Sequence, residues 1–129
     1  MIKTSNTTHW IDEEGIIHSL FDPQTSDTLE TAKENIEADK QLAEGKQLPL
    51  LVDIRNLKSQ SREAQNYYAD EEALKVLSAC AILIDSGLSK VIGNFFIAVK
   101  KPKLPTRLFT SESEALQWLR QFKGEQNGK

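Results

Sequence analysis

The sequence predicts a single α/β domain in which helices flank a mixed, mostly parallel sheet. Two observations carry this prediction. Apolar runs typical of strands covered on both faces, such as residues 48–54, alternate with segments whose apolar residues recur at helical spacing. Turn-forming residues separate these segments, and a length of 129 residues suits one domain. Alternating strands and helices imply crossovers of one hand, and therefore a largely parallel sheet with helices outside it.

The first half of the chain is predicted to hold a β-hairpin, a long helix and a covered strand. Asp27 is expected to cap the helix, with Glu30 three residues further on, and Gly45 is expected to end it. Residues 57–60 are expected to form a loop. The predicted strands of this half are residues 8–12, 15–21 and 48–54, with Glu13-Glu14-Gly15 as the hairpin turn.

The second half is predicted to complete the element order ββαβαβαβα. Ser61 is expected to cap a helix that runs to about residue 72, and Asp85 or Ser86 to cap the next helix. Ser111 and Glu114 match a capping box at the start of the last helix. The apolar stripe of that helix is formed by Ala115, Leu116, Leu119 and Phe122. The two predicted strands of this second half are the later part of residues 76–84 and residues 106–109.

The clearest helical stripe of the chain begins after the turn at residues 85–87 and ends before the prolines at 102 and 105. Its apolar residues recur at i, i+3, i+4, i+7, i+8 and i+11, and we expect most of them to face the core. They are Leu88, Val91, Ile92, Phe95, Phe96 and Val99. Phe95 and Phe96 point about 100° apart, so one of them is expected at the core margin. Together with the adjacent Tyr67 and Tyr68, they are candidates for a homodimer seam or an apolar cleft.

Composition and charge narrow the classes of function. The net charge is −3, with fifteen acidic and six basic side chains in residues 12–72, and four acidic and nine basic in residues 73–129. Such polarity is typical of solvated helix faces, although it can also steer an acidic partner. Nucleic acid is not an expected partner, because the chain is acidic and its lysines lack interleaved aromatic residues.

The chain is expected to be one domain over residues 1–129, with flexible ends at 1–7 and 124–129. It has one cysteine, Cys80, which excludes an internal disulfide, and its apolar neighbours predict a buried, inert thiol. No run is typical of a signal peptide or of a membrane span, so we expect a cytoplasmic protein without membrane insertion.

The sequence contains no convincing catalytic or metal-binding motif, so we expect neither an enzyme nor a bound cofactor. Asp53 and Asp85 end strands that could be neighbours, where two carboxylates could hold Mg²⁺. We expect Asp53 instead to be a structural anchor that accepts nearby N–H groups or pairs with Arg55. His9 and His18 are expected at the surface of the first two strands, because no further ligand spacing converges on them.

Four segments of the chain, in their order, carry a family likeness. They are Gly15-Ile16-Ile17 with Thr28-Leu29-Glu30-Thr31-Ala32; Leu51-Val52-Asp53-Ile54-Arg55; Arg62-Glu63-Ala64-Gln65-Asn66-Tyr67-Tyr68; and Arg107-Leu108-Phe109 with Glu114-Ala115-Leu116-Gln117-Trp118-Leu119. Together they resemble the STAS/SEC14 superfamily, and within it the uncharacterised bacterial SpoIIAA-like proteins. The resemblance implies the STAS fold of anti-sigma-factor antagonists and a non-catalytic, regulatory role in signalling.

The resemblance also implies where a phosphorylation switch would lie. In regulatory STAS proteins, a partner kinase phosphorylates a serine or threonine at the start of the helix after the third strand. The usual run of an aspartate, two hydroxyl residues and a glycine is absent here. Ser61 stands at the aspartate position, and Arg62 and Glu63 stand at the hydroxyl positions. A constitutive binder therefore suits the sequence as well as a switch at Ser59 or Ser61.

Two hypotheses follow from this resemblance. The first is a protein-interaction domain whose partner is another signalling protein, such as a kinase-type regulator. Its partner-binding or switch loop would comprise Ser59, Ser61, Arg62, Glu63, Tyr67 and Tyr68. The alternative is a small-molecule or lipid-binding domain of the SEC14 type, which needs a cavity between the third helix and the sheet. The candidate cleft residues are Leu83, Ile92, Phe95 and Phe96.

Overall fold

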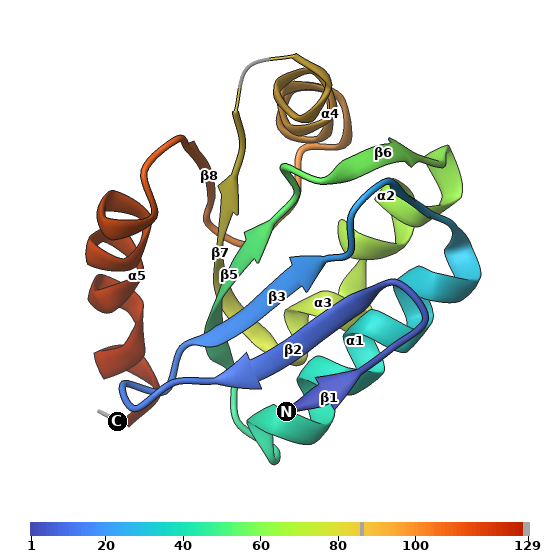
Figure 1. Cartoon of the computed structure of the whole chain (residues 1–129). Coiled ribbons are helices and arrows are strands. Elements are labelled where there is room, and N and C mark those ends of the chain that lie inside the picture. The colour runs from blue at the N-terminus through green and yellow to red at the C-terminus, as the bar shows by residue number, and fades with distance from the viewer. Residues whose placement is uncertain (86, 128–129) are drawn as a thin grey trace.

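In the described part of the chain, six strands form one mixed sheet in the order β1-β2-β3-β5-β7-β8 (Figure 1). This computed structural model describes residues 1–85 and 87–127. β1 and β3 each pair with β2 antiparallel, whereas β3, β5, β7 and β8 are parallel to one another. The strands are β1 (Ile2–Lys3), β2 (Thr7–Ile11), β3 (Ile17–Phe21), β5 (Leu48–Asp53), β7 (Leu77–Leu83) and β8 (Thr106–Phe109). The predicted α/β class, with a mostly parallel sheet flanked by helices, is confirmed.

The helices are divided unequally between the two faces of this sheet. The four parallel strands follow one another in one direction across the sheet, so crossovers of one hand place their helices on one face. Of the helices in the described part of the chain, only the last covers the other face (Figure 1). The crossover helices are α1 (Leu29–Ala43), α2 (Arg62–Tyr68), α3 (Glu71–Leu74) and α4 (Leu88–Phe95), which continues as the π-helix η1 (Phe96–Lys100). The last helix is α5 (Glu112–Asn127).

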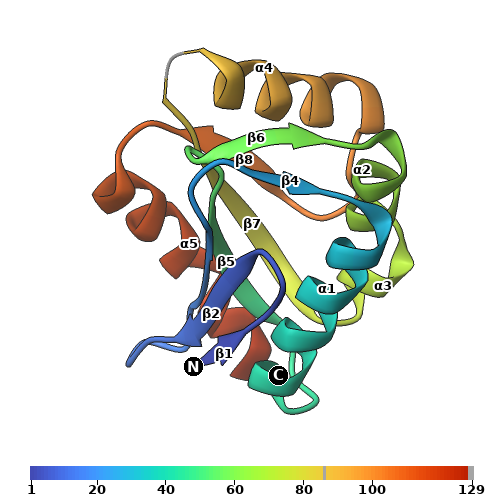
Figure 2. The ribbon, with the colours of Figure 1, turned by 45° about the vertical axis from the view of Figure 1, so that its right-hand side comes forward.

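A second, two-stranded sheet lies beneath α4 and was not predicted (Figure 2). Its strands are β4 (Thr25–Asp27) and β6 (Leu57–Gln60), which pair in parallel with a register shift. The prediction of a loop over residues 57–60 is therefore wrong. Both strands are short and mostly polar, and such segments lack the apolar alternation by which a strand is recognised in a sequence.

Two predicted helix boundaries also differ from the structure. Thr28, not Asp27, is the N-cap of α1, and its side chain and that of Thr31 cap each other's backbone N–H groups. The helix predicted from Ser61 to residue 72 is divided in two, because Asp70 accepts a hydrogen bond from the backbone N–H of Glu71 and so begins α3. Ser61 caps α2 as predicted, accepting from the backbone N–H of Ala64 at 3.0 Å.

The predicted stripe of α5 packs against the sheet as expected. Ala115 and Leu119 are fully buried, and Leu116 and Phe122 pack beside them. Ser111 Oγ accepts from the backbone N–H of Glu114 at 3.3 Å, so the predicted cap is present. None of the described helices is long and apolar enough to cross a bilayer.

The first seven residues, expected to be flexible, contribute to both a strand and the buried interior. Ile2 and Lys3 form β1 against β2, and the turn that follows packs against α1. Asn6 and Thr7 are among the buried polar residues of the domain. This segment therefore supplies hydrogen-bonding groups to the interior.

Candidate functional site

A cavity of about 80 Å³ lies between the main sheet and the helices of the crossover face. Val52 and Cys80, on two central strands, contribute to its floor, and Ile92 and Phe96 of α4 and η1 contribute to its roof. Val52 and Cys80 keep partly accessible surfaces although they lie deep in the domain. Residues on central, doubly covered strands are normally closed off by neighbours. The cavity explains why these two residues are not.

Polar side chains border one flank of the cavity, and a buried histidine–aspartate pair is the centre of this group. His9 Nδ1 lies 2.8 Å from Asp39 Oδ1, and His9 Nε2 lies 2.6 Å from Thr7 Oγ1. His9 has no exposed surface, and the side chain of Asp39 is 3% exposed. Burial raises the pKa of the Asp39 carboxyl, and the hydrogen bond and charge of His9 oppose that rise only in part.

The prediction of surface histidines is therefore wrong. His9 faces α1 from the inner side of β2, and it has no exposed surface. His18 is 9% exposed and stacks on Trp10, and its Nε2 lies 2.8 Å from Asp12 Oδ2. A signal for the His9 site was present in α1. Asn35 and Asp39 stand three and seven residues after Ala32, on the same face as the apolar residues that pack on the sheet.

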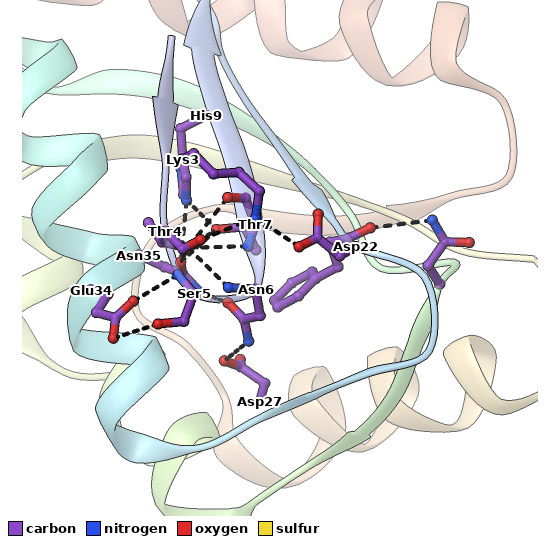
Figure 3. A network of polar contacts seen from close by, with 12 residues as sticks. Lys3, Thr4, Ser5, Asn6, Thr7, His9, Asp22, Asp27, Glu34 and Asn35 are labelled. Atoms are coloured by element: carbon purple, nitrogen blue, oxygen red, sulfur yellow. Dashed lines mark hydrogen bonds and ion pairs between the residues drawn. The ribbon is translucent and has the colours of Figure 1, made fainter.

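Asp27, also buried, joins four elements and the turn at residues 4–7 into one polar network. Its carboxylate accepts hydrogen bonds from the side chains of Asn6, Thr31, Gln60 and Tyr68. Figure 3 shows how the turn at residues 4–7 meets Asn35 and Glu34 of α1 on one side and Asp27 on the other. These bonds satisfy the Asp27 carboxylate away from bulk solvent, which is the usual condition for burying a polar group.

Tyr68 connects this network to the cavity. Its hydroxyl donates to Asp27 Oδ2 at 2.8 Å and accepts from Asn35 Nδ2 at 3.1 Å. Burial, followed by the negative charge of Asp27, raises the pKa of Tyr68 well above its ordinary value. The phenol is therefore a neutral hydrogen-bonding group that borders the cavity.

The stripe predicted to face the core from α4 and η1 faces solvent for the most part. Four of its six side chains are exposed: Leu88 by 50%, Val91 by 64%, Phe95 by 42% and Val99 by 53%. Ile92 and Phe96 alone of the six turn inward. The expectation that most of the stripe is core is wrong. We call the exposed set Leu88, Val91, Phe95 and Val99 the outer face of α4.

Small residues explain why this stripe faces outward. Ser89 and Gly93 occupy the inner side of α4, and a Cβ added at Gly93 would lie 2.8 Å from Leu108 Cδ2. The helix therefore approaches the sheet through its smallest side chains, which leaves its bulky ones outside. The spacing of Ser89 and Gly93 is the feature of the sequence that could have indicated this orientation.

The residues of the predicted switch loop are dispersed between surface and interior. Ser59 on β6 is exposed and its Oγ donates to Ser26 Oγ at 2.8 Å, while Ser61 caps α2. Arg62 and Glu63 are exposed in the first turn of α2. Tyr67 is half-buried, and burial is the main cause that raises its pKa. Tyr68 instead points its hydroxyl into the polar network.

The four candidate cleft residues are similarly divided. Ile92 and Phe96 border the cavity. Phe95 belongs to the outer face of α4, where Lys100 Nζ lies 5.9 Å from the centre of its ring. Leu83 packs on the opposite face of the sheet, in the cluster that contains Leu119 of α5.

The two aspartates considered as a metal site have structural partners. Asp53 accepts from the backbone N–H of Arg55 at 3.0 Å and pairs with its guanidinium at 2.7 Å, as predicted. Asp85 accepts from Ser89 Oγ, and the N-cap of α4 is Gly87 rather than Asp85. Ser86, the other cap considered, lies outside the described residues. Within those residues, no three histidine, cysteine or acidic side chains converge as a metal site.

Cys80, the single cysteine, fits the predicted inert thiol. Burial raises its pKa to about 12, and the charge of Asp39 adds to that rise. A thiol of such a pKa provides almost no thiolate at neutral pH, and the thiolate is the reactive form. Cys80 therefore contributes its volume and polarisability to the cavity wall, not nucleophilic chemistry.

Comparison with known proteins places this fold. A similar solved structure is that of an uncharacterised protein of the DUF3478 family, with a SpoIIAA-like fold, from Shewanella loihica PV-4. The two share 16% sequence identity with a TM-score of 0.62, over 92% of this chain and 98% of the other. No curated protein matches the chain. The model of a family described as "Domain of unknown function (DUF7793)" matches residues 9–123. The chain therefore belongs to the DUF7793 family, and its fold is SpoIIAA-like.

Proposed function

We propose that this chain is a non-catalytic protein-interaction domain that contacts its partner through the outer face of α4. The observation that carries the proposal is the exposure of four large apolar side chains along one helix face, each by 42% or more. Single exposed apolar residues are ordinary, but a contiguous row marks a surface that another molecule covers. β6, which bears the exposed Ser59, lies beneath α4, on the side opposite to this row (Figure 2).

Charge indicates the kind of partner. Residues 87–103 contain Lys90, Lys100, Lys101 and Lys103 and no acidic residue, although the chain as a whole carries a charge of −3. Basic residues around an apolar centre favour a partner whose own apolar patch has an acidic rim. The acidic remainder of the chain opposes adsorption to an anionic bilayer, so we assign the surface to a protein.

A pair of variants tests this assignment. The double variant Val91→Ser/Phe95→Ser removes the centre of the outer face, and Ile11→Ser is the matched control because Ile11, on β2, is 40% exposed. Wild type and both variants are used as baits in host lysate, captured proteins are identified by mass spectrometry, and binding is re-measured with the purified partner. We expect a partner that wild type and Ile11→Ser retain, that the double variant loses, and whose binding weakens with salt.

Three results would contradict the proposal. The double variant, correctly folded by circular dichroism, could retain the same partner as wild type. Sedimentation could show that the wild-type chain itself dimerises through this face and that the double variant is monomeric. The purified protein could bind vesicles of phosphatidylglycerol with a dependence on Val91 and Phe95, which would assign the surface to membranes.

A further inference from the structure

We infer that the cavity beneath α4 is a binding site for a short, uncharged aliphatic molecule with one hydroxyl group. This inference is independent of the proposed protein partner, because the cavity and the outer face of α4 use opposite sides of the helix. Ile92 and Phe96 face the cavity, whereas Val91 and Phe95 face away from it.

Two polar groups on the cavity wall have hydrogen-bonding capacity that the described residues do not use. Ser19 is 4% exposed and borders the cavity, and its hydroxyl has no hydrogen-bond partner in the described part of the chain. Asp39 is 2% exposed, and its Oδ1 contacts His9 while its Oδ2 has no partner among the described side chains. Neither oxygen is sealed off by protein atoms, since the one buried side-chain oxygen without a partner among the described residues is Ser78 Oγ, and both are therefore open to a ligand in the cavity.

Strand pairing places these two groups in one corner. His9 and Ser19 are directly opposite each other across β2 and β3, so their side chains stand side by side on the same face of the sheet. His9 in turn contacts Asp39 from α1. A ligand hydroxyl in this corner could donate a hydrogen bond to Asp39 Oδ2 and accept one from the hydroxyl of Ser19. A hydroxyl is suited to both bonds because it is donor and acceptor at once.

The charges around the cavity decide against an anionic head group. Asp39 borders the cavity, and Asp27 lies one hydrogen bond away through Tyr68. No lysine or arginine among the described residues borders it. A carboxylate or phosphate would be buried beside Asp39 without a cation, which is costly. An ammonium group would have to give up its full hydration, and this costs more than the desolvation of a hydroxyl.

The size of the cavity limits the body of the ligand. Its wall is mainly apolar, with Leu50, Val52, Ile54, Ile82 and Phe96 among its residues. Its volume of about 80 Å³ is roughly half that of the engineered 150 Å³ cavity that admits benzene. A chain of about four carbon atoms is therefore an appropriate probe, and a lipid with long acyl chains is too large for the cavity as it stands.

The experiment compares three probes that differ only in the head group: butan-1-ol, butyrate and butan-1-amine. Each is titrated into the full chain while amide and methyl shifts are followed by NMR. We expect saturable shifts at Val52 and Ile82 with butan-1-ol, and binding at least about tenfold weaker for butyrate and for the amine. The absence of saturable shifts with butan-1-ol, or equal or tighter binding of either charged probe, would overturn the inference.

Variants then test the residues. Ser19→Ala removes a hydroxyl that has no partner among the described residues, so the fold should be unaffected while affinity for butan-1-ol falls about tenfold. Ser59→Ala is the matched control on the surface and should not change affinity. Cys80→Leu, which fills the cavity, should abolish binding, and Val91→Ser/Phe95→Ser should preserve it. Unchanged affinity in Ser19→Ala would refute the assigned corner, whatever the outcome for the protein partner.

Discussion

The two faces of the main sheet are both covered by helices, but in different ways. On one face, α5 packs Ala115 and Leu119 onto the sheet with no exposed surface. On the other face, several shorter helices meet a buried polar network, enclose a cavity, and leave the outer face of α4 in solvent. Packing on the α5 face is complete, and on the α4 face it is not.

This difference indicates where stability and function are concentrated. Complete apolar packing stabilises a fold but offers nothing to a partner. An incompletely packed interior with unpaired polar groups, and a row of exposed apolar side chains, both lower stability unless a ligand or partner covers them. We therefore assign the scaffold to the α5 face and binding to the α4 face.

The largest expected effect comes from comparing one substitution in α5 with one in α4. Leu119 is fully buried on α5, and Leu88 is 50% exposed on α4. We expect Leu119→Ala to lower the free energy of unfolding by about 2–5 kcal/mol, because it leaves a cavity in a closed core. Leu88→Ala should change it by about 0.5 kcal/mol or less. Urea unfolding followed by tryptophan fluorescence measures both, and equal losses would break the comparison.

A second prediction concerns the buried pair at the cavity. Asp39→Asn should lower the free energy of unfolding by about 1–3 kcal/mol at acid pH, because it weakens the hydrogen bond to His9. The folded-state pKa of Asp39 is raised above the ordinary value of 3.8, so wild type loses stability as pH rises from that value through the folded pKa. Asparagine does not titrate, so the advantage of wild type over the variant should shrink over that range.

Urea unfolding at a series of pH values measures this change. The groups that act on or respond to Asp39 are His9, Tyr68 and Cys80. An advantage of wild type that grows with pH would show that the carboxylate is stabilised by its surroundings, contrary to the raised pKa.

The smallest predicted change in the free energy of unfolding compares two serines on the α4 side, one that caps a helix and one that is exposed. Ser61 caps α2, whereas Ser59, two residues earlier, is exposed on β6. Ser61→Ala should lower the free energy of unfolding by about 1 kcal/mol, because an N–H at the start of α2 loses its acceptor. Ser59→Ala should change it by about 0.5 kcal/mol or less. Chemical denaturation of the two variants compares them, and a larger loss at Ser59 would contradict the assigned cap.

The α5 face could be predicted from the sequence, and the α4 face could be predicted only in part. One cap and one apolar stripe are enough to place α5, because a single helix with a single apolar side has one way to cover a sheet. The stripe on α4 shows that the helix has an apolar side but not that this side is buried. Ser89 and Gly93 decide that question through their small size.

The polar network escaped prediction because its partners are far apart in the chain. His9 and Asp39 are separated by 30 residues, and Asp27 and Tyr68 by 41. Each residue alone is typical of a surface, and only the fold shows that they meet. β4 and β6 escaped for a related reason, since each exists by pairing with the other rather than through its own apolar pattern.

The most direct test of the difference between the two faces is a crystal structure determined under xenon pressure. Xenon occupies apolar cavities and does not enter closely packed cores. We predict xenon density between the sheet and α4, in contact with Val52, Cys80 or Phe96, and none between the sheet and α5. A sheet with xenon on neither face, or with xenon beside Leu119, would contradict the assignment of packing to one face and binding to the other.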